Sequence, residues 1–226
     1  VDIAKESLQN IPARKNDEFD NYIYKAPLGV IFIMAPWNYP IITATNTIVP
    51  ALLAGNSMVL KHSSQTPRCA ELIDQALKNT GLPEGVFQFI HTDHSACQKI
   101  IADTRIAHVV FTGSVKGGQE VKKYIGTRFI NVGLELGGKD PAYVRSDADL
   151  NYAIENLVDG AFFNSGQSCC GIERIYVDQS IYKDFIDGFK ALTEKYVLGD
   201  PSQEGTNLGP VVRLSAANFI RAQMKE

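Results

Sequence analysis

Short apolar runs alternate with amphipathic stretches through the middle of this chain. Residues 29–34 and 57–61 are rich in Val, Ile, Leu and Met, and stretches with apolar positions at helical spacing follow both runs. Apolar runs of this length are typical of strands that are buried on both faces of a sheet. The alternation predicts strands at 29–34, 57–61, 86–90, 108–112 and 131–135, with helices that end near residue 53 or cover 66–80, 95–102 and about 118–125.

This order of elements predicts an α/β fold: an open, mostly parallel, Rossmann-like sheet with helices on both faces. In such sheets, ligands bind at the carboxyl ends of the strands. The residues that follow each strand are therefore the candidates for function, and they carry polar or glycine chemistry. They are Trp37 and Asn38, Lys61 to Ser64, Gly113 and Ser114, and Glu135 to Gly138.

The pattern differs at the two ends of the chain. Residues 1–16 are polar with helical character that Pro12 interrupts, and residues 17–25 alternate loosely, like an edge strand or an arm. After Gly138 we expect a short strand, a helix, a loop, a second strand and a second helix. We divide the chain into an N-terminal segment at 1–26, a sheet domain at 27–138 and the beginning of a second α/β domain at 139–226.

Composition excludes several classes of partner. The 226 residues are 45% hydrophobic and 21% charged, and the net charge of −3 gives no electrostatic basis for binding nucleic acid or an anionic membrane. No apolar run is long enough to span a bilayer, and the first residues do not have the layout of a signal peptide. The 4 cysteines lack the spacing of a disulfide framework, which favours a reducing, cytoplasmic location. The 4 histidines are scattered, so we expect no metal site.

Two adjacent thiols, Cys169 and Cys170, lie in the loop between the helix and the second strand of the C-terminal part. Gly166 and Gly171 flank the pair, so the backbone can turn tightly and a substrate can come close. Folds commonly present a nucleophile in such a loop. Most free cysteines are instead small buried hydrophobic residues, but a structural cysteine does not need the polar lead-in that precedes this pair. Neighbouring cysteines also meet disulfide geometry poorly.

The lead-in carries a resemblance to a known family. Residues 162–169 read Phe-Phe-Asn-Ser-Gly-Gln-Ser-Cys, which resembles the active-site signature Phe-x-Asn-x-Gly-Gln-x-Cys of the aldehyde dehydrogenase superfamily. In that signature, the catalytic thiol belongs to the cysteine two positions after Gln. The resemblance therefore assigns the nucleophile to Cys169 and not to Cys170.

Residues 36–40, Pro-Trp-Asn-Tyr-Pro, resemble the family's Pro-Trp-Asn-x-Pro motif. An amide NH₂ on a turn between two prolines is a fixed donor, which can stabilise negative charge that develops on a carbonyl oxygen. A helix cap is the structural alternative for this Asn. The resemblance implies that Asn38 donates to the oxyanion and that Trp37 belongs to the cofactor site.

Residues 61–67, Lys-His-Ser-Ser-Gln-Thr-Pro, resemble the family's Lys-Pro-x-Glu-x-Thr-Pro motif, with His62 in place of the usual Pro. Lys61 can hydrogen-bond a ribose hydroxyl, although a lysine there can also be a solvated strand end. Members that prefer NAD often have Glu at the position of Ser64, where a carboxylate binds the ribose diol and repels a 2′-phosphate. Ser64 removes this repulsion, so the resemblance implies NAD or NADP as the cofactor.

Residues 111–118 resemble the family's Phe-Thr-Gly-Ser-x-x-x-Gly motif. A small residue and a hydroxyl before a helix N-terminus suit a pyrophosphate, because free backbone N–H groups point at it. The resemblance places Gly113, Ser114 and Gly118 in the cofactor site. As a glycine loop alone, the motif would be a weak signal.

Residues 134–139, Leu-Glu-Leu-Gly-Gly-Lys, match another motif of the family. A carboxylate that ends an apolar strand is costly to bury, and a buried carboxyl group suits a general base. The alternative is an ion pair of Glu135 with Lys139 or Arg174. The resemblance assigns the general base to Glu135 and adds Leu136 to the cofactor site.

Together, the motifs imply NAD(P)-dependent oxidation of an aldehyde to a carboxylic acid. The Cys169 thiolate attacks the carbonyl carbon, Asn38 and the Cys169 N–H hold the oxyanion, hydride passes to nicotinamide, and Glu135 activates the water that hydrolyses the thioester. Residues 27–138 then form the dinucleotide-binding domain and residues 139–226 the start of the catalytic domain. The resemblance also implies that residues 1–26 form an arm that joins subunits into a homodimer or homotetramer in the full-length protein, with a surface connection as the structural alternative.

Other functions stay open at this stage. A CoA-acylating aldehyde dehydrogenase lacks the base, so Glu135 argues against it. A chain that keeps the fold only to bind nucleotide or to build a complex is a non-catalytic alternative. A papain-like thiol hydrolase needs a His base that no loop motif here supplies. Family members are roughly twice as long as this chain, so we expect a fragment that covers the middle of the family's pattern, and its activity alone stays open.

Overall fold

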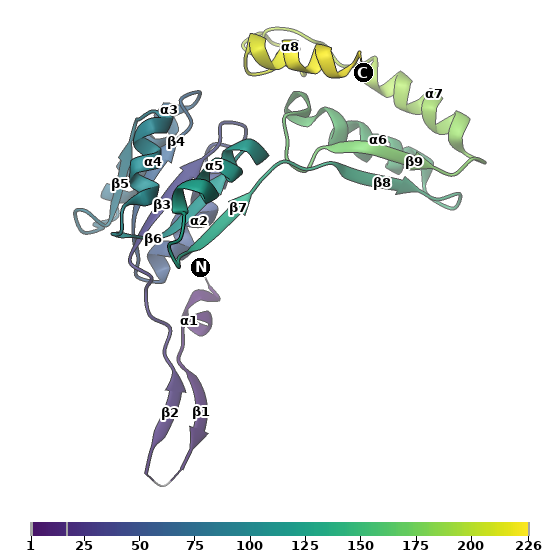
Figure 1. Ribbon diagram of the computed structural model, residues 1–226. Helices are drawn as coiled ribbons and strands as arrows, with labels where there is room; N and C mark the ends of the chain where they lie inside the picture. Colours follow the sequence, from purple (N-terminus) through teal and green to yellow (C-terminus); the bar gives the residue numbers. More distant parts are fainter. Residues whose placement is uncertain (1, 17, 226) are drawn as a thin grey trace. The chain divides into compact units, whose positions relative to one another are not determined.

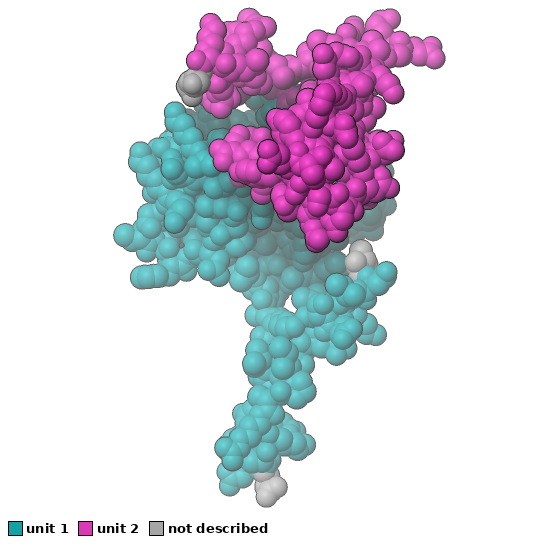
Figure 2. Space-filling model, turned by 90° about the vertical axis from the view of Figure 1, so that its right-hand side faces the viewer, with its two compact units in different colours: residues 1–136 teal, residues 137–226 magenta. Residues whose placement is uncertain are grey.

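The computed structural model describes residues 2–16 and 18–225, so residues 1, 17 and 226 of the ranges named above lie outside the described part. The chain divides into two compact units, Val1–Leu136 and Gly137–Glu226, which Figure 2 colours separately. Each unit has its own hydrophobic core. We describe each unit by itself.

Unit 1 contains a five-stranded sheet in which every described pairing is parallel. Its strand order is β5-β4-β3-β6-β7, with β3 in the centre (Figure 1). Four helices connect the strands and cover both faces, which confirms the predicted fold class. The elements are β3 (Val30–Ala35), α2 (Ile42–Leu53), β4 (Ser57–His62), α3 (Pro67–Lys78), β5 (Phe87–Ile90), α4 (His94–Ala102), β6 (Ile106–Thr112), α5 (Val115–Ile125) and β7 (Asn131–Glu135).

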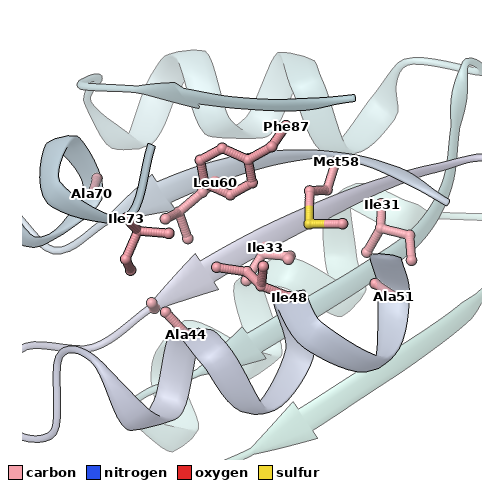
Figure 3. Close-up of a cluster of buried hydrophobic side chains, with 11 residues drawn as sticks. Ile31, Ile33, Ala44, Ile48, Ala51, Met58, Leu60, Ala70, Ile73 and Phe87 are labelled. Carbon is pink, nitrogen blue, oxygen red and sulfur yellow. The ribbon is translucent and has the colours of Figure 1, made fainter. Parts of the chain in front are cut away.

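The alternation of side chains along β3 divides the core of unit 1 into two layers. Ile31 and Ile33 point to one face and pack with residues of α2, α3, β4 and β5, as Figure 3 shows. Phe32 and Met34 point to the opposite face and pack with α4, α5 and β6. Since both faces are covered, β3 is buried along nearly its whole length. This is why it appears in the sequence as one continuous apolar run.

A buried amide fixes the start of β3. The Asn56 side chain is 5% exposed, and its Oδ1 accepts hydrogen bonds from Leu28 N (2.7 Å) and Gly29 N (3.1 Å). Its Nδ2 donates to Ala51 O at the end of α2 (3.1 Å). One side chain thus joins the entry to β3, the exit from α2 and the entry to β4.

The first residues differ from the sequence-based prediction. Only a short helix, α1 (Ala4–Ser7), forms there, and Pro12 lies inside a strand instead of interrupting a helix. β1 (Ile11–Lys15) pairs antiparallel with β2 (Asp20–Ile23) in a separate two-stranded hairpin. Pro is compatible with a strand at a free edge, because it lacks only the donor of one ladder bond. Every side chain of the two strands is exposed.

Unit 2 is built from a parallel strand pair and three helices. A compact core of Val144, Ile154, Val158 and Phe185 joins β8, α6 and α7. Gly188 lets the two helices approach closely, because a Cβ there would lie 2.4 Å from Ile154 Cδ1. The elements are β8 (Asp140–Val144), α6 (Leu150–Phe162), the 3₁₀ helix η1 (Phe163–Gly166), β9 (Ile172–Val177), α7 (Tyr182–Thr193) and α8 (Leu214–Gln223).

Within residues 2–16 and 18–225, no helix combines the length and the apolar character that crossing a membrane requires.

We predict that Asn56→Leu destabilises unit 1 by about 1–3 kcal/mol, because the part-buried N–H groups of Leu28 and Gly29 lose their acceptor, whereas Ala51 O keeps the bond from Asn56 N. Urea unfolding monitored by circular dichroism measures the change. Asn79→Leu is the control, since Asn79 is an exposed residue at the end of α3. Equal midpoints for the two variants would show that the Asn56 amide does not hold β3.

Candidate active site

The parallel sheet brings the polar ends of four strands to one edge of unit 1. β4, β3, β6 and β7 are neighbours in that order and all run in the same direction, so their carboxyl ends share an edge (Figure 1). Chain order reverses beside β3, since β4 lies on one side and β6 on the other. Open α/β sheets bind ligands at such a switch point. Except for Gly118 in α5, the predicted residues of unit 1 lie at the ends of these strands or directly after them: Trp37 and Asn38, Lys61 and Ser64, Gly113 and Ser114, and Glu135 and Leu136.

The loop after β3 carries Trp37 and Asn38, and both side chains are half-buried. It leads directly into α2, where Thr43 N donates to Tyr39 O (3.1 Å) and Thr43 Oγ1 bonds to the same carbonyl (2.6 Å). Backbone and side chain therefore hold the end of the loop at the start of the helix. The structure thus places the Asn38 amide in a fixed turn at the strand edge.

The end of β4 carries Lys61, which is half-buried, and Ser64, which is exposed in the turn before α3. Burial raises the pKa of the Cys97 thiol on α4, and the charge of Lys61 acts in the opposite direction. Lys61 is the penultimate residue of β4 and so belongs to the carboxyl end of that strand. This places a cation at the edge where a polar ligand would enter.

The N-terminus of α5 differs from the prediction, because the helix begins at Val115 and not near residue 118. Ser114 is the N-cap, and its Oγ accepts a hydrogen bond from Gly117 N (3.1 Å). Gly113 N donates to Glu135 O (2.9 Å) and so joins the ends of β6 and β7. Ser114, a common N-cap residue, indicated in the sequence that α5 begins at Val115. The two helix-disfavouring glycines at 117 and 118 obscured this signal.

Three glycines bring the backbone of this turn close to two apolar side chains. A Cβ on Gly113 or Gly117 would lie 2.6 Å or 2.5 Å from Cζ of the Phe111 ring. A Cβ on Gly118 would lie 2.8 Å from Leu136 Cδ2. Gly118 is thus a buried packing position on α5 in this structure, and its role in cofactor binding, like that of Leu136, stays a prediction.

A cavity of about 430 Å³ lies between α4 and α5, beside this helix N-terminus. Apolar side chains dominate its interior, whereas Ser114 and Lys116 stand at the start of α5. A pocket of this kind can hold a flat apolar ring, while the helix N-terminus can bind a phosphate group. Of the site residues predicted from motifs, Ser114 lines this cavity. The other residues that define it include Cys97, Ile101, Phe111, Val121 and Tyr124.

The thiol loop of unit 2 has an unusual backbone. Asn164 and Ser165 adopt positive φ angles of 51° and 58°, and Gly166 follows with 71°. Two non-glycine residues in the left-handed region are a source of local strain, which persists only where other contacts impose it. The Ser165 hydroxyl supplies one such contact by donating to Gly209 O (2.7 Å).

The polar lead-in forms a reciprocal pair that holds this loop. Asn164 Nδ2 donates to Gln167 O (3.3 Å), and Gln167 Nε2 donates to Asn164 O (3.0 Å). The other amide atom of Gln167, Oε1, accepts from Val212 N (2.7 Å). The Asn and Gln of the motif are therefore explained as supports of the loop that precedes the thiols.

The two thiols are exposed, and Cys170 bonds to Ser168. Partial desolvation raises the pKa of the Cys169 thiol, and the neighbouring Cys170 raises it further. In the structure described here, these surroundings keep Cys169 protonated to higher pH than a free cysteine. A thiol nucleophile reacts as the thiolate, so activation must come from a further group or from a substrate-bound state.

The structure also corrects two expectations about charged residues. Glu135 is exposed and not buried at the end of β7. Lys139 forms an ion pair with Glu173, so it is not the partner of Glu135. Gly138 is required beside the thiol loop, because a Cβ there would lie 2.0 Å from Cys169 O. In the described part of the chain, no group of three or more His, Cys, Asp or Glu side chains could hold a metal ion.

Asn38 and Glu135 belong to unit 1, and Cys169 belongs to unit 2. Each unit therefore presents its own share of the predicted chemistry. Unit 1 contains the predicted amide, the predicted carboxylate and the strand edge where ligand binding is predicted, and unit 2 contains the predicted thiol.

Comparisons with known proteins show the family of the chain. The model of the aldehyde dehydrogenase family matches residues 2–226. Succinate semialdehyde dehydrogenase [NAD(P)+] Sad of Escherichia coli (strain K12) is 36% identical over 200 residues, which are 88% of this chain and 43% of that protein. Succinate-semialdehyde dehydrogenase [NADP(+)] 1 of Mycobacterium bovis (strain BCG / Pasteur 1173P2) is 38% identical over 200 residues, or 88% of this chain and 44% of that protein.

The fold agrees as well. The crystal structure of succinic semialdehyde dehydrogenase from Streptococcus pyogenes in complex with NADP+ superposes with a TM-score of 0.92 at 30% identity, over 99% of this chain and 49% of that one. The chain thus spans less than half the length of these relatives. Its sequence, its fold and its thiol loop lead to one conclusion: the chain belongs to the aldehyde dehydrogenase family.

Proposed function

We propose that the whole protein oxidises an aldehyde to a carboxylic acid with NAD or NADP. The observation that carries the proposal is the thiol loop, in which Asn164 and Gln167 hold the backbone that presents Cys169. The family match over residues 2–226 supports it. A nucleotide-binding chain without catalysis would have no need of an exposed thiol in a strained loop.

In this proposal, each residue has one task. Cys169 attacks the aldehyde carbon, and the oxyanion accepts hydrogen bonds from the Asn38 amide and the Cys169 N–H. The bound cofactor supplies an oxidised nicotinamide that accepts a hydride. Glu135 then takes a proton from the water that hydrolyses the thioester on Cys169. An exposed carboxylate has access to this water.

The cofactor-binding proposal rests on the strand edge of unit 1. The apolar cavity between α4 and α5 suits the adenine ring, the N-terminus of α5 suits the pyrophosphate, and Lys61 suits a ribose hydroxyl. These residues fit a dinucleotide. Ser64 offers a hydroxyl where a carboxylate would repel a 2′-phosphate, so we propose that NADP is accepted as well as NAD.

For the substrate, we propose a short aldehyde that carries a carboxylate, such as succinate semialdehyde. The support is the name of the relatives in Escherichia coli and Mycobacterium bovis. Steady-state rates of the whole protein across a panel of aldehydes test this, with uncharged aldehydes of equal length as the comparison. Equal rates with and without the carboxylate would contradict the proposal.

We predict that Cys169→Ala in the whole protein lowers kcat by at least about 10³-fold, because the nucleophile is lost. Cys170→Ala should keep kcat within about three-fold, since Cys170 takes no part in the covalent step. Steady-state kinetics with NAD and NADP measure both values. Full loss of activity in Cys170→Ala alone would reverse the assignment of the nucleophile.

The raised pKa of Cys169 predicts a pH dependence that needs no turnover. Alkylation of Cys169 by iodoacetamide follows the thiolate, so its rate should still rise at pH values where a free cysteine has reached its maximum. Cys170→Ala removes one cause of the raised pKa and should move the midpoint to lower pH. Peptide mass spectrometry measures the rate at each pH, and Cys69→Ala is the control that should leave the midpoint unchanged. An unchanged midpoint in Cys170→Ala would contradict the coupling.

We predict that Ser64→Glu lowers kcat/KM for NADP by about ten-fold or more while NAD is affected less, because a carboxylate repels the 2′-phosphate. The ratio of kcat/KM values for the two cofactors is the measurement. Ser64→Ala is the matched control, since it removes the hydroxyl without adding charge. An equal loss with both cofactors would place the ribose elsewhere.

A further inference from the structure

A buried imidazole stands at the end of β4 and has no task in the proposed reaction. His62 is 1% exposed and is the last residue of the strand. It shares a face of β4 with Met58 and Leu60, which are apolar and fully buried. The alternation therefore predicts an apolar residue at this position, and a polar ring there needs partners.

Both ring nitrogens of His62 have a partner. Nε2 lies 2.8 Å from Pro40 O, and Nδ1 lies 3.2 Å from Thr66 Oγ1. A carbonyl oxygen can only accept, so Nε2 must carry a proton. In a neutral ring Nδ1 is then the acceptor, and the Thr66 hydroxyl donates to it. These two bonds fix the orientation and the tautomer of the ring.

The two partners belong to the two loops that the proposed function uses. Pro40 ends the loop after β3 that carries Trp37 and Asn38. Thr66 ends the turn after β4 that carries Ser64. Backbone pairing between the strands stops at Ala35 and His62, so beyond this point the ladder no longer holds the two loops together. The imidazole spans them where the ladder ends.

Thr66 shows that this bond replaces an ordinary local one. It is the N-cap of α3, where a threonine hydroxyl commonly accepts a hydrogen bond from the first turn of the helix. No side-chain cap bond forms at this helix end, and the hydroxyl bonds to His62 instead. The Thr66 side chain therefore bonds to His62 at the end of β4 instead of capping α3.

We propose that His62 is a positioning residue that locks the loop of residues 36–40 to the turn of residues 63–66. The lock keeps the amide of Asn38 at a fixed distance from the cofactor contacts at Lys61 and Ser64. It rests on the proposed function for the tasks of these residues, whereas the lock itself is a property of unit 1. A ligand that orders the turn will also order the loop, because one ring bonds to both.

Trp37 offers a direct readout, because it is the single tryptophan of the chain and lies in the locked loop. Its fluorescence thus reports the loop without any background from other residues of its type. Acrylamide quenching and fluorescence anisotropy measure how freely it moves. Neither measurement requires turnover, so the outcome stays separate from that of the proposed function.

The test compares three substitutions in the full chain. His62→Leu keeps an apolar side chain in the core and removes both bonds, Thr66→Val removes only the bond to the turn, and His62→Gln retains a donor for Pro40 O. We expect His62→Leu to raise the quenching constant of Trp37 by about two-fold or more, since the loop loses its anchor. Thr66→Val should give a smaller rise, and His62→Gln should stay near the wild type.

His108→Leu is the matched control. This imidazole lies on β6 in the same sheet, and its ring Nδ1 is buried without a hydrogen-bond partner in the described part of the chain. It pairs with Ile31 near the start of β3, away from the locked loop. The substitution makes the same chemical change and should leave Trp37 quenching unchanged.

Two results would overturn the proposal. The first is a folded His62→Leu variant, by circular dichroism, with the same Trp37 quenching as His108→Leu. If His62→Leu does not fold, Thr66→Val decides, and quenching equal to that of the control is the overturning result. The second is a nitrogen NMR spectrum of the His62 side chain with the proton on Nδ1, because that tautomer cannot donate to Pro40 O.

Discussion

The parallel register of β4, β3, β6 and β7 is the constraint on which the rest of the structure depends. Because these strands are neighbours and run the same way, four loops that are far apart in the sequence end at one edge. No single loop there could hold a dinucleotide. The edge as a whole combines a cation, a capped helix N-terminus, an apolar cavity and an amide donor. The sheet therefore brings the predicted site residues of unit 1 to one edge.

Two buried polar side chains bond to backbone at the strand ends, where the hydrogen bonds between strands stop. Asn56 joins the amino-terminal end of β3 to its neighbours, and His62 joins the loops at the carboxyl end. An apolar side chain could fill either position, but it could not bond to loop backbone. Both residues are well satisfied by partners, so they add order without a large penalty for burial. Under the proposed function, such order would keep the Asn38 donor oriented before a substrate arrives.

In unit 2, side-chain hydrogen bonds hold the loop that carries the thiols. The exposed thiols lie beyond the core of Val144, Ile154, Val158 and Phe185, so packing alone would leave their loop mobile. Reciprocal bonds between Asn164 and Gln167, with anchors to the segment 209–212, hold it in a left-handed conformation instead. Asn164 and Gln167 of the family motif thus stabilise the conformation of the loop. Partial desolvation and the neighbouring Cys170 raise the pKa of the Cys169 thiol, so these surroundings do not favour its thiolate.

The sequence by itself determined the elements of the sheet, the fold class and the family. Short continuous apolar runs between turn residues indicated strands covered on both faces, and the motif around Cys169 indicated the family. Two local signals were misread. Pro12 lies in the exposed strand β1 but suggested the interruption of a helix, and the glycines at 117 and 118 obscured the start of α5 at Val115. Only the tertiary structure decided that Glu135 is exposed, that a cavity lies between α4 and α5, and that His62 bonds to two loops. Such facts depend on which segments meet in space, and hydrophobic periodicity carries no information about partners that are distant in the chain.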